Sequence, residues 1–251
     1  MYLSWEEKKI NEFDDKTIES AYNDGFVFTR VAKGTMNQTR SLRIDLQKFE
    51  LSSENKRILK KTEDLNLSIS PIPYPGYTWE IHKLGKDFYE QKFGKGTFSA
   101  QKIKELIIDK EKSNFNQLFV YSLPAVILSP ASGINSAKNP LHQTERDPSV
   151  VKLPQDDKRL PVGYCIALET ENIIHYCYPF YDLELNYQNL GMGMMLKAIV
   201  WAKEQGKQYI YLGSAQRPTD TYKLQLAGLE WFDGSKWHED LEKLKLILQT
   251  A

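Results

Sequence analysis

The sequence is poor in the residues that build disulfide frameworks and metal sites. It has only two cysteines, Cys165 and Cys177, and four histidines without ligand spacing, which excludes a disulfide scaffold and a cysteine-rich zinc site. Its 33 basic and 33 acidic residues cancel, so overall charge does not favour DNA or a membrane surface as a partner. No apolar run approaches the ~20 residues of a membrane span, and no signal sequence is present. We therefore expect a cytoplasmic protein with no metal and no membrane or DNA partner.

Residues 161–213 carry the clearest local pattern. Two runs rich in β-branched and aromatic residues, separated by four polar ones, predict a β-hairpin over 162–181. Apolar residues then recur at helical spacing over 194–202, and this pattern stops at Gly206. A short apolar strand is expected over 208–212. The predicted order is strand, strand, helix, strand.

Residues 1–72 are predicted to form a small basic α/β module. Residues 41–49 alternate between apolar and charged side chains, which is typical of a strand, and a serine-capped helix is expected to end near Thr62. From Arg30 to Lys61 there are nine basic and three acidic residues, a local net charge of +6. Such a face suits a phosphate backbone, although a solvated surface helix is an equally open alternative. The residues that could contact such a backbone are Arg30, Arg40, Arg43, Lys56, Arg57, Lys60 and Lys61.

A proline-rich segment at 70–77 marks the expected boundary to a second domain, residues 73–251. Amphipathic helices are predicted at 82–93 and 99–112. Residues 129–160 are polar and lack periodicity, which indicates a long loop or insertion. Together these elements predict an α+β fold with a mixed sheet flanked by helices.

A glycine motif stands where the helix of the 161–213 stretch begins. It reads Gln188-Asn189-Leu190-Gly191-Met192-Gly193. Free backbone N–H groups at such a helix start can bind a phosphate. The motif, in this strand and helix context, resembles the pyrophosphate loop of the GNAT superfamily of acyltransferases, which implies a GNAT-like fold. The resemblance also implies that this is an acyl-donor loop, in which Gln188, Leu190, Gly191 and Gly193 face the donor.

A second resemblance covers both halves of the chain. Residues 40–65, RSLRIDLQKFELSSENKRILKKTEDL, join a basic-apolar strand to a serine-capped basic helix. Later motifs follow in order: Phe180-Tyr181-Asp182, Leu190-Gly191, Tyr211-Leu212-Gly213 and Tyr222-Lys223. This series resembles the arginyl-tRNA–protein transferases, the N-end-rule aminoacyltransferases. The resemblance implies transfer of an amino acid from aminoacyl-tRNA, as co-substrate, to the N-terminal amine of a protein, with no further cofactor. It also implies that the seven basic residues named above between Arg30 and Lys61 bind the tRNA.

The sequence departs from that family at one point. The family's N-terminal cysteine cluster is missing, because residues 33–39 read KGTMNQT. No metal or iron–sulfur site can be built there from cysteine. The resemblance suggests protein arginylation, but which amino acid is moved, and which N-terminus accepts it, stays open.

Aminoacyl transfer also indicates which side chains to examine. A free α-amino group has a pKa of ~7.7–8, so a strong base is not required, whereas the departing ribose oxygen needs a proton donor. Tyr181, Tyr211 and Tyr222 are candidate hydroxyl donors. Asp182 could hold a cationic amine, and Lys223 could meet a phosphate or the terminal ribose. The alternative for each tyrosine is a core position with a satisfied hydroxyl.

Two other functions remain open. An acetyl-CoA-dependent N-acetyltransferase of the same fold would use the glycine motif for CoA. A non-catalytic tRNA- or peptide-binding module would keep the fold without the reaction.

Overall fold

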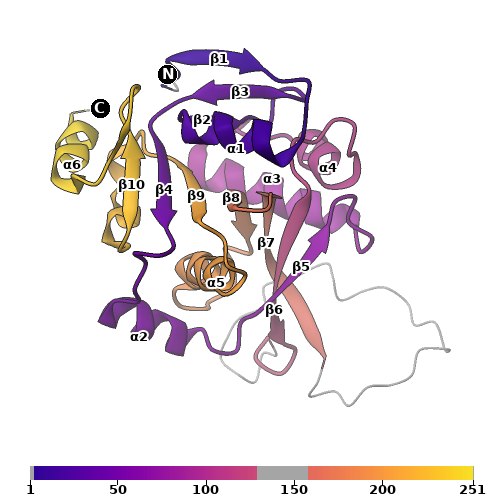
Figure 1. Ribbon diagram of the computed structural model, residues 1–251. Coiled ribbons are helices and arrows are strands. Elements are labelled where there is room, and N and C mark those ends of the chain that lie inside the picture. The colour runs from indigo at the N-terminus through magenta and orange to yellow at the C-terminus, as the bar shows by residue number, and fades with distance from the viewer. Residues whose placement is uncertain (1–2, 129–157, 251) are drawn as a thin grey trace.

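The computed structural model describes residues 3–128 and 158–250, and Figure 1 shows their arrangement. In chain order the elements are β1 (Glu6–Lys9), α1 (Asp15–Asn23), β2 (Phe26–Phe28), β3 (Thr35–Gln38), β4 (Ser41–Asp45), α2 (Ser53–Lys61), β5 (Asn66–Pro71), α3 (Trp79–Phe93), α4 (Ala100–Ile108), β6 (Gln117–Pro124), β7 (Arg159–Glu169), β8 (Ile173–Tyr181), α5 (Leu190–Glu204), β9 (Tyr209–Ser214), the 3₁₀ helix η4 (Pro218–Gln225), β10 (Leu229–Phe232), β11 (Trp237–His238) and α6 (Leu241–Gln249).

The centre of the molecule is an eight-stranded mixed sheet in the order β11-β10-β4-β9-β8-β7-β6-β5. Its pairs are antiparallel except β8 and β9, which run parallel because α5 crosses over between them. A second, three-stranded sheet in the order β1-β3-β2 lies with α1 at the top of Figure 1. The predicted α+β architecture, a large mixed sheet flanked by helices, is confirmed.

Residues 1–72 contribute to both sheets. β1, β2 and β3 form the small sheet, whereas β4 pairs with β9 and β10, and β5 pairs with β6. The proposed boundary at residue 72 therefore falls between neighbouring strands of one sheet.

The two faces of the large sheet bury separate cores because successive strand residues point to opposite sides. On one face α2, α5 and α6 cover residues such as Phe119, Cys165 and Ile210. On the other face α1, α3, α4 and the small sheet cover residues such as Leu118, Tyr164 and Tyr211. The central strands are therefore covered by different helices on their two faces.

Most predicted elements agree with the observed ones. The hairpin of 162–181 is the β7–β8 pair, and the glycine-started helix is α5. α2 begins after Ser52, whose Oγ accepts a hydrogen bond from the Asn55 N–H at 3.1 Å, so the predicted serine cap is confirmed. β5 was not expected, since it lies where a domain boundary was predicted. Of the expected loop 129–160, residues 129–157 lie outside the described residues.

Within the described part of the chain, no helix is long and apolar enough to cross a membrane. The helix α5 is rich in apolar residues because it is buried against the sheet, not because it faces lipid.

Asp233 organises the turn between β10 and β11. Its carboxylate accepts hydrogen bonds from the N–H groups of Ser235 and Lys236 at 2.8 and 3.0 Å, and it pairs with the His238 ring. Desolvation acts to raise the pKa of Asp233, but these hydrogen bonds outweigh it and hold that pKa below its usual range.

We expect Asp233→Asn to lower the melting temperature at neutral pH, because the uncharged amide accepts these bonds more weakly. In the wild type, the stabilisation from Asp233 is present above the unfolded-state pKa of about 4 and is lost as the pH falls below it. The variant should therefore show a smaller loss of stability between about pH 4 and pH 2. Thermal denaturation across this range measures both effects. Parallel pH profiles for the two proteins would contradict this role.

Candidate functional site

The strands β8 and β9 part from each other beside the predicted site. Over their described length they pair only through Ile173–His175 and Tyr209–Tyr211. β8 nevertheless continues to Tyr181 and β9 to Ser214. We call the region between these unpaired ends, residues 176–181 of β8 and 212–214 of β9, the wedge. The start of α5 follows β8 in the chain. Residues 177–179 are half-buried, which leaves this side of the wedge accessible.

The glycines of the acyl-donor loop are required by close packing. A Cβ on Gly191 would lie 2.8 Å from the Tyr181 hydroxyl oxygen, and a Cβ on Gly193 would lie 2.7 Å from the Thr62 side chain. Asn189, directly before the helix, has the left-handed backbone angle φ 62°. Both glycines are therefore required because β8 and the end of α2 pack closely against α5. No bound phosphate is needed to explain them.

The basic helix and the acyl-donor loop lie side by side. Lys61, at the end of α2, donates a hydrogen bond from Nζ to Oε1 of Gln188 at 3.4 Å. Lys56, Arg57 and Lys60 are also exposed on α2, and Arg57 forms a surface ion pair with Glu54. Two groups of residues that are 127 positions apart in the chain thus meet at the start of α5.

Gly193→Ala is expected to weaken the contact between α2 and α5. The new methyl group would overlap Thr62, and overpacking of this kind destabilises a protein by about 1–3 kcal/mol. Denaturant unfolding measures the loss. Adding Thr62→Ala should restore part of it, because two of the three closest atoms are then absent. Full stability of the single variant would show that Gly193 is not required by packing.

Tyr181 supplies a hydroxyl group at the start of α5, and Tyr222 carries a second hydroxyl group on η4. The Tyr181 ring packs on Phe88 at 4.8 Å between centroids, and burial raises the Tyr181 pKa. The pKa of Tyr222 is raised to about 12, first by desolvation and then by Asp220 and Tyr181. Both phenols therefore keep their protons at neutral pH and can donate hydrogen bonds.

Asp182 and Lys223 lie at the ends of the two parted strands. The Asp182 N–H donates to the Val162 carbonyl at 3.0 Å, and its carboxylate caps the following turn by accepting from the Glu184 N–H at 2.9 Å. Lys223 is buried, and its Nζ donates to the carbonyl oxygens of Leu212 and Ser214 at 3.0 and 3.2 Å. Burial lowers the Lys223 pKa. The ammonium group therefore points into the protein at β9, not to a surface phosphate.

The predictions for Tyr211 and Arg43 are corrected by their burial. Tyr211 is 1% exposed, its ring meets the Tyr22 ring edge-on at 4.9 Å, and it lies inside the α1-covered core. Arg43 is 6% exposed, pairs with Glu230 at 2.7 Å and stacks on the Trp237 ring at 4.0 Å. Arg43 is held in this buried ion pair and also donates to the Tyr211 hydroxyl oxygen at 3.4 Å, so neither polar group belongs to an exposed cationic face.

Two further predicted tRNA contacts point away from α2. Arg30 donates from Nη2 to the Thr97 carbonyl at 2.6 Å, between α3 and α4. Arg40 is half-buried and donates to the Ala215 carbonyl at 3.3 Å. The strongly basic region of the sequence is thus divided in space, and only its α2 part forms an exposed cationic face beside the acyl-donor loop.

His175 lies on β8 and is buried beside the parted strand ends. Its Nδ1 atom forms a hydrogen bond with the Tyr22 hydroxyl at 2.8 Å. Burial, and then the charge of Lys223, lower the His175 pKa to about 3, so the ring is neutral. Nothing in the local sequence distinguishes this histidine, since its surroundings come from α1, β9 and η4.

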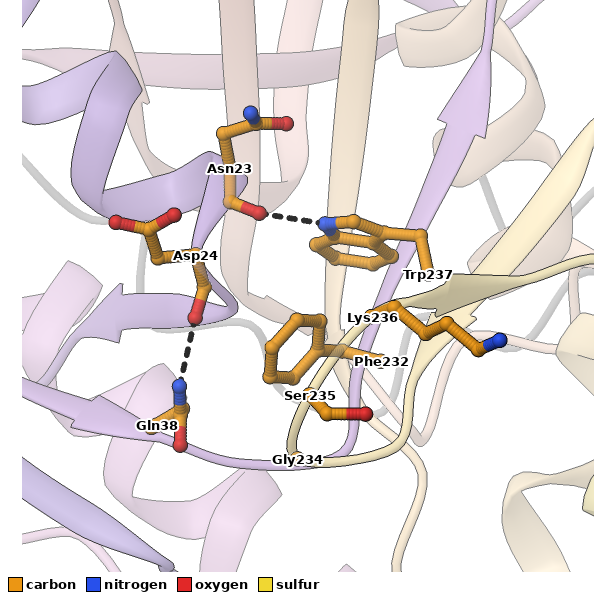
Figure 2. A pocket seen from close by; sticks show the side chains of 8 residues that line it. All are labelled: Asn23, Asp24, Gln38, Phe232, Gly234, Ser235, Lys236 and Trp237. Atoms are coloured by element: carbon orange, nitrogen blue, oxygen red, sulfur yellow. Dashed lines mark hydrogen bonds between the residues drawn. The ribbon is translucent and has the colours of Figure 1, made fainter.

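A separate hollow of about 440 Å³ lies between the α1–β2 turn and the β10–β11 turn (Figure 2). One hydrogen bond beside it links β11 to the end of α1, from Trp237 Nε1 to the Asn23 carbonyl. Another links β3 to the α1–β2 turn, from Gln38 Nε2 to the Asp24 carbonyl. None of the predicted site residues lines this hollow. It does not contribute to the candidate site at the β8–β9 wedge.

The chain was compared with known protein families and proteins. Residues 80–233 match the family model described as "Arginine-tRNA-protein transferase, C terminus". The aspartate/glutamate leucyltransferase of Ruegeria pomeroyi is 24% identical over 199 residues, or 78% of this chain, and the match spans 60% of that protein's length. The enzyme of the same name from Dinoroseobacter shibae is 23% identical over 236 residues, or 90% of this chain and 73% of the relative.

Solved structures show weaker likenesses. L-PGS from Bacillus licheniformis has a TM-score of 0.43 and 12% identity, over 80% of this chain and 52% of that one. FemX has a TM-score of 0.40 and 11% identity, over 82% of this chain and 61% of that one. At such low TM-scores these likenesses carry no argument about this protein, and its GNAT-like character stays a prediction.

The family match includes the parts that build the candidate site. Residues 80–233 contain β8, the whole acyl-donor loop, α5, β9 and η4. They also make up more than half of the 251 residues. The chain therefore belongs to the arginine-tRNA-protein transferase family.

Proposed function

We propose that this protein transfers an amino acid from an aminoacyl-tRNA to the N-terminal amine of another protein. The observation that carries the proposal is the meeting of the basic helix α2 with the acyl-donor loop, supported by the Lys61–Gln188 contact, in a chain of this family. A tRNA phosphate backbone would lie on the exposed lysines of α2. Its aminoacylated end would then reach the start of α5 and the wedge.

The donor and acceptor are proposed from the names of the relatives. Those names are aspartate/glutamate leucyltransferases, so we propose leucine as the amino acid moved and an acidic first residue as the acceptor. The family name instead suggests arginine, which is the competing donor.

The side chains at the wedge suit this reaction. The acceptor amine attacks the ester carbonyl carbon, a C–N bond forms, and the bond to the ribose oxygen breaks. The amine loses a proton and the ribose oxygen gains one. Tyr181 would donate a hydrogen bond to the departing oxygen, because its raised pKa keeps the hydroxyl protonated. The Asp182 carboxylate would hold the ammonium form of the acceptor before it is deprotonated.

The proposal is tested with labelled Leu-tRNA and Arg-tRNA and with peptides that begin with Asp, Glu, Asn, Gln or Lys. We expect label to enter the peptide only when charged tRNA is present, at its α-amine, and most rapidly from Leu-tRNA to acidic peptides. Tyr181→Phe is the matched variant, since it removes one hydroxyl and keeps the packing on Phe88. No transfer from either tRNA to any peptide, together with stabilisation by CoA, would exclude the proposed reaction and favour an acetyltransferase.

A further inference from the structure

Three hydrogen-bond donors contact or belong to the two strands that form the wedge. The first is Arg30, which reaches β8 from the segment between β2 and β3. Its guanidinium carbon lies 4.4 Å from the Phe98 ring centre and 5.8 Å from that of Tyr178, the neighbour of Cys177. These rings hold the guanidinium flat against the aromatic wall of this face. Arg30 is only half-buried, so it lies where the wedge meets solvent.

The second donor is His175, two residues before Cys177 on β8. The Tyr22 hydroxyl oxygen accepts a hydrogen bond from the Phe28 N–H at 3.3 Å, and its own proton can be donated to Nδ1 of His175, 2.8 Å away. In the neutral tautomer that accepts this proton, the other ring nitrogen, Nε2, carries a proton. That Nε2 atom is buried, and no partner for it exists among the described residues. Buried N–H groups are usually paired, so this Nε2 can donate to an acceptor atom from outside the chain.

The third donor is Lys223, which approaches from η4 at the β9 side. Two protons of its ammonium group bind carbonyl oxygens of β9, and the third is left for another acceptor. Leu212, whose carbonyl Lys223 binds, directly follows Tyr211, which pairs with His175, so Lys223 contacts β9 where the two strands begin to part. Among the described residues neither Arg30 nor Lys223 has a carboxylate within salt-bridge distance.

A buried cation, a half-buried cation and an unpaired N–H donor together suit an oxygen anion. We propose that Arg30, His175 and Lys223 hold the side-chain carboxylate of the first residue of the acceptor protein. The proposal rests on the proposed function and assigns the residues that select the acceptor.

The position of this cluster favours the acceptor over the tRNA. Phe98, Tyr178 and Tyr22 belong to the core on the α1, α3 and α4 face of the sheet. The exposed lysines lie on α2, which covers the opposite face together with α5. Donor and acceptor would then approach the wedge from opposite faces, which is required if they are to meet at the strand ends.

The test compares peptides that begin with Asp and with Asn, which have nearly the same shape but differ in charge. For the wild type we expect a higher kcat/KM for Asp than for Asn. Arg30→Gln should reduce this Asp/Asn ratio by about 10- to 100-fold, mainly through the Asp peptide, because a charge-assisted contact is lost. Lys112→Gln is the matched control. It removes an exposed cation at the end of α4 and should leave the ratio unchanged.

A second variant separates recognition from folding. His175→Phe removes the Nε2 proton, and it should reduce the Asp/Asn ratio while its circular dichroism spectrum stays that of the wild type. If the His175→Phe protein does not fold, the Asp/Asn ratio of Arg30→Gln alone tests the carboxylate site. An unchanged ratio in Arg30→Gln, or a wild type that does not prefer Asp, would overturn the carboxylate site. In either case the wild type still transfers amino acids, whereas failure of the proposed function abolishes transfer to every peptide.

Discussion

Replacing Glu230 by leucine is expected to lower the free energy of unfolding by about 3–5 kcal/mol, because it leaves the buried guanidinium of Arg43 without its charge partner. The two side chains are 10% and 7% exposed, and their ion pair joins β10 to β4 at 2.7 Å. After the substitution the hydrogen bonds left to Arg43 among the described residues would be those to the neutral groups of Asn23 and Tyr211, at 3.0 and 3.4 Å. Urea unfolding followed by tryptophan fluorescence measures the change.

The double variant Arg43→Leu with Glu230→Leu is the control for this experiment. It removes both charges, so it should be more stable than Glu230→Leu alone. The exposed pair Arg57–Glu54 offers a comparison at the surface, where loss of one partner should have little effect. A Glu230→Leu protein as stable as the wild type would show that this ion pair does not hold β10 against β4.

Reversing two charges on α2, by Lys60→Glu together with Lys61→Glu, is expected to weaken binding of aminoacyl-tRNA by at least about tenfold at low salt. Both lysines are exposed at the end of α2, and Lys61 lies beside the acyl-donor loop. Each lost phosphate contact also reduces the slope of log K against log salt by about 0.7–0.9. Filter binding or fluorescence anisotropy at several salt concentrations measures the affinity and the slope together.

The matched control is Lys110→Glu with Lys112→Glu, which makes the same change in net charge on the opposite face of the molecule. It should alter the affinity only slightly, because long-range effects between exposed charges are screened by salt. Equal losses in the two double variants would assign the effect to overall charge and remove α2 from the tRNA-binding surface.

Local patterns predicted the elements that depend on neighbours in the chain. The β7–β8 hairpin, α2 with its Ser52 cap, and α5 all follow from periodicity, capping and turn residues within about 20 positions. β5 was missed because its partner β6 supplies the hydrogen bonds that make it a strand. Half-buried and exposed residues are mixed along β5, and no residue of it is fully buried. Such a segment gives little indication that it is a strand.

Side-chain roles were predicted less well, because they depend on contacts between distant segments. Arg43 alternates with apolar residues as a surface charge would, but Glu230 and Trp237 from the far end of the chain cover it. Tyr211 lies near the end of a strand in the sequence, but in the structure Tyr22 and Arg43 enclose it. Arg30 belongs to the same basic stretch as Lys61, yet the two lie on different faces of the sheet.

The sequence by itself determined the hairpin, the glycine-started helix, the basic helix and the family resemblance, since each is encoded in residues close together in the chain. Only the tertiary structure decided which of these features meet. It brought α2 to the acyl-donor loop, showed that Gly193 is required by Thr62, and placed Arg30, His175 and Lys223 around one wedge. The physical reason is that local hydrogen bonding sets helices and strands, whereas burial and the pairing of polar groups across long separations set the site.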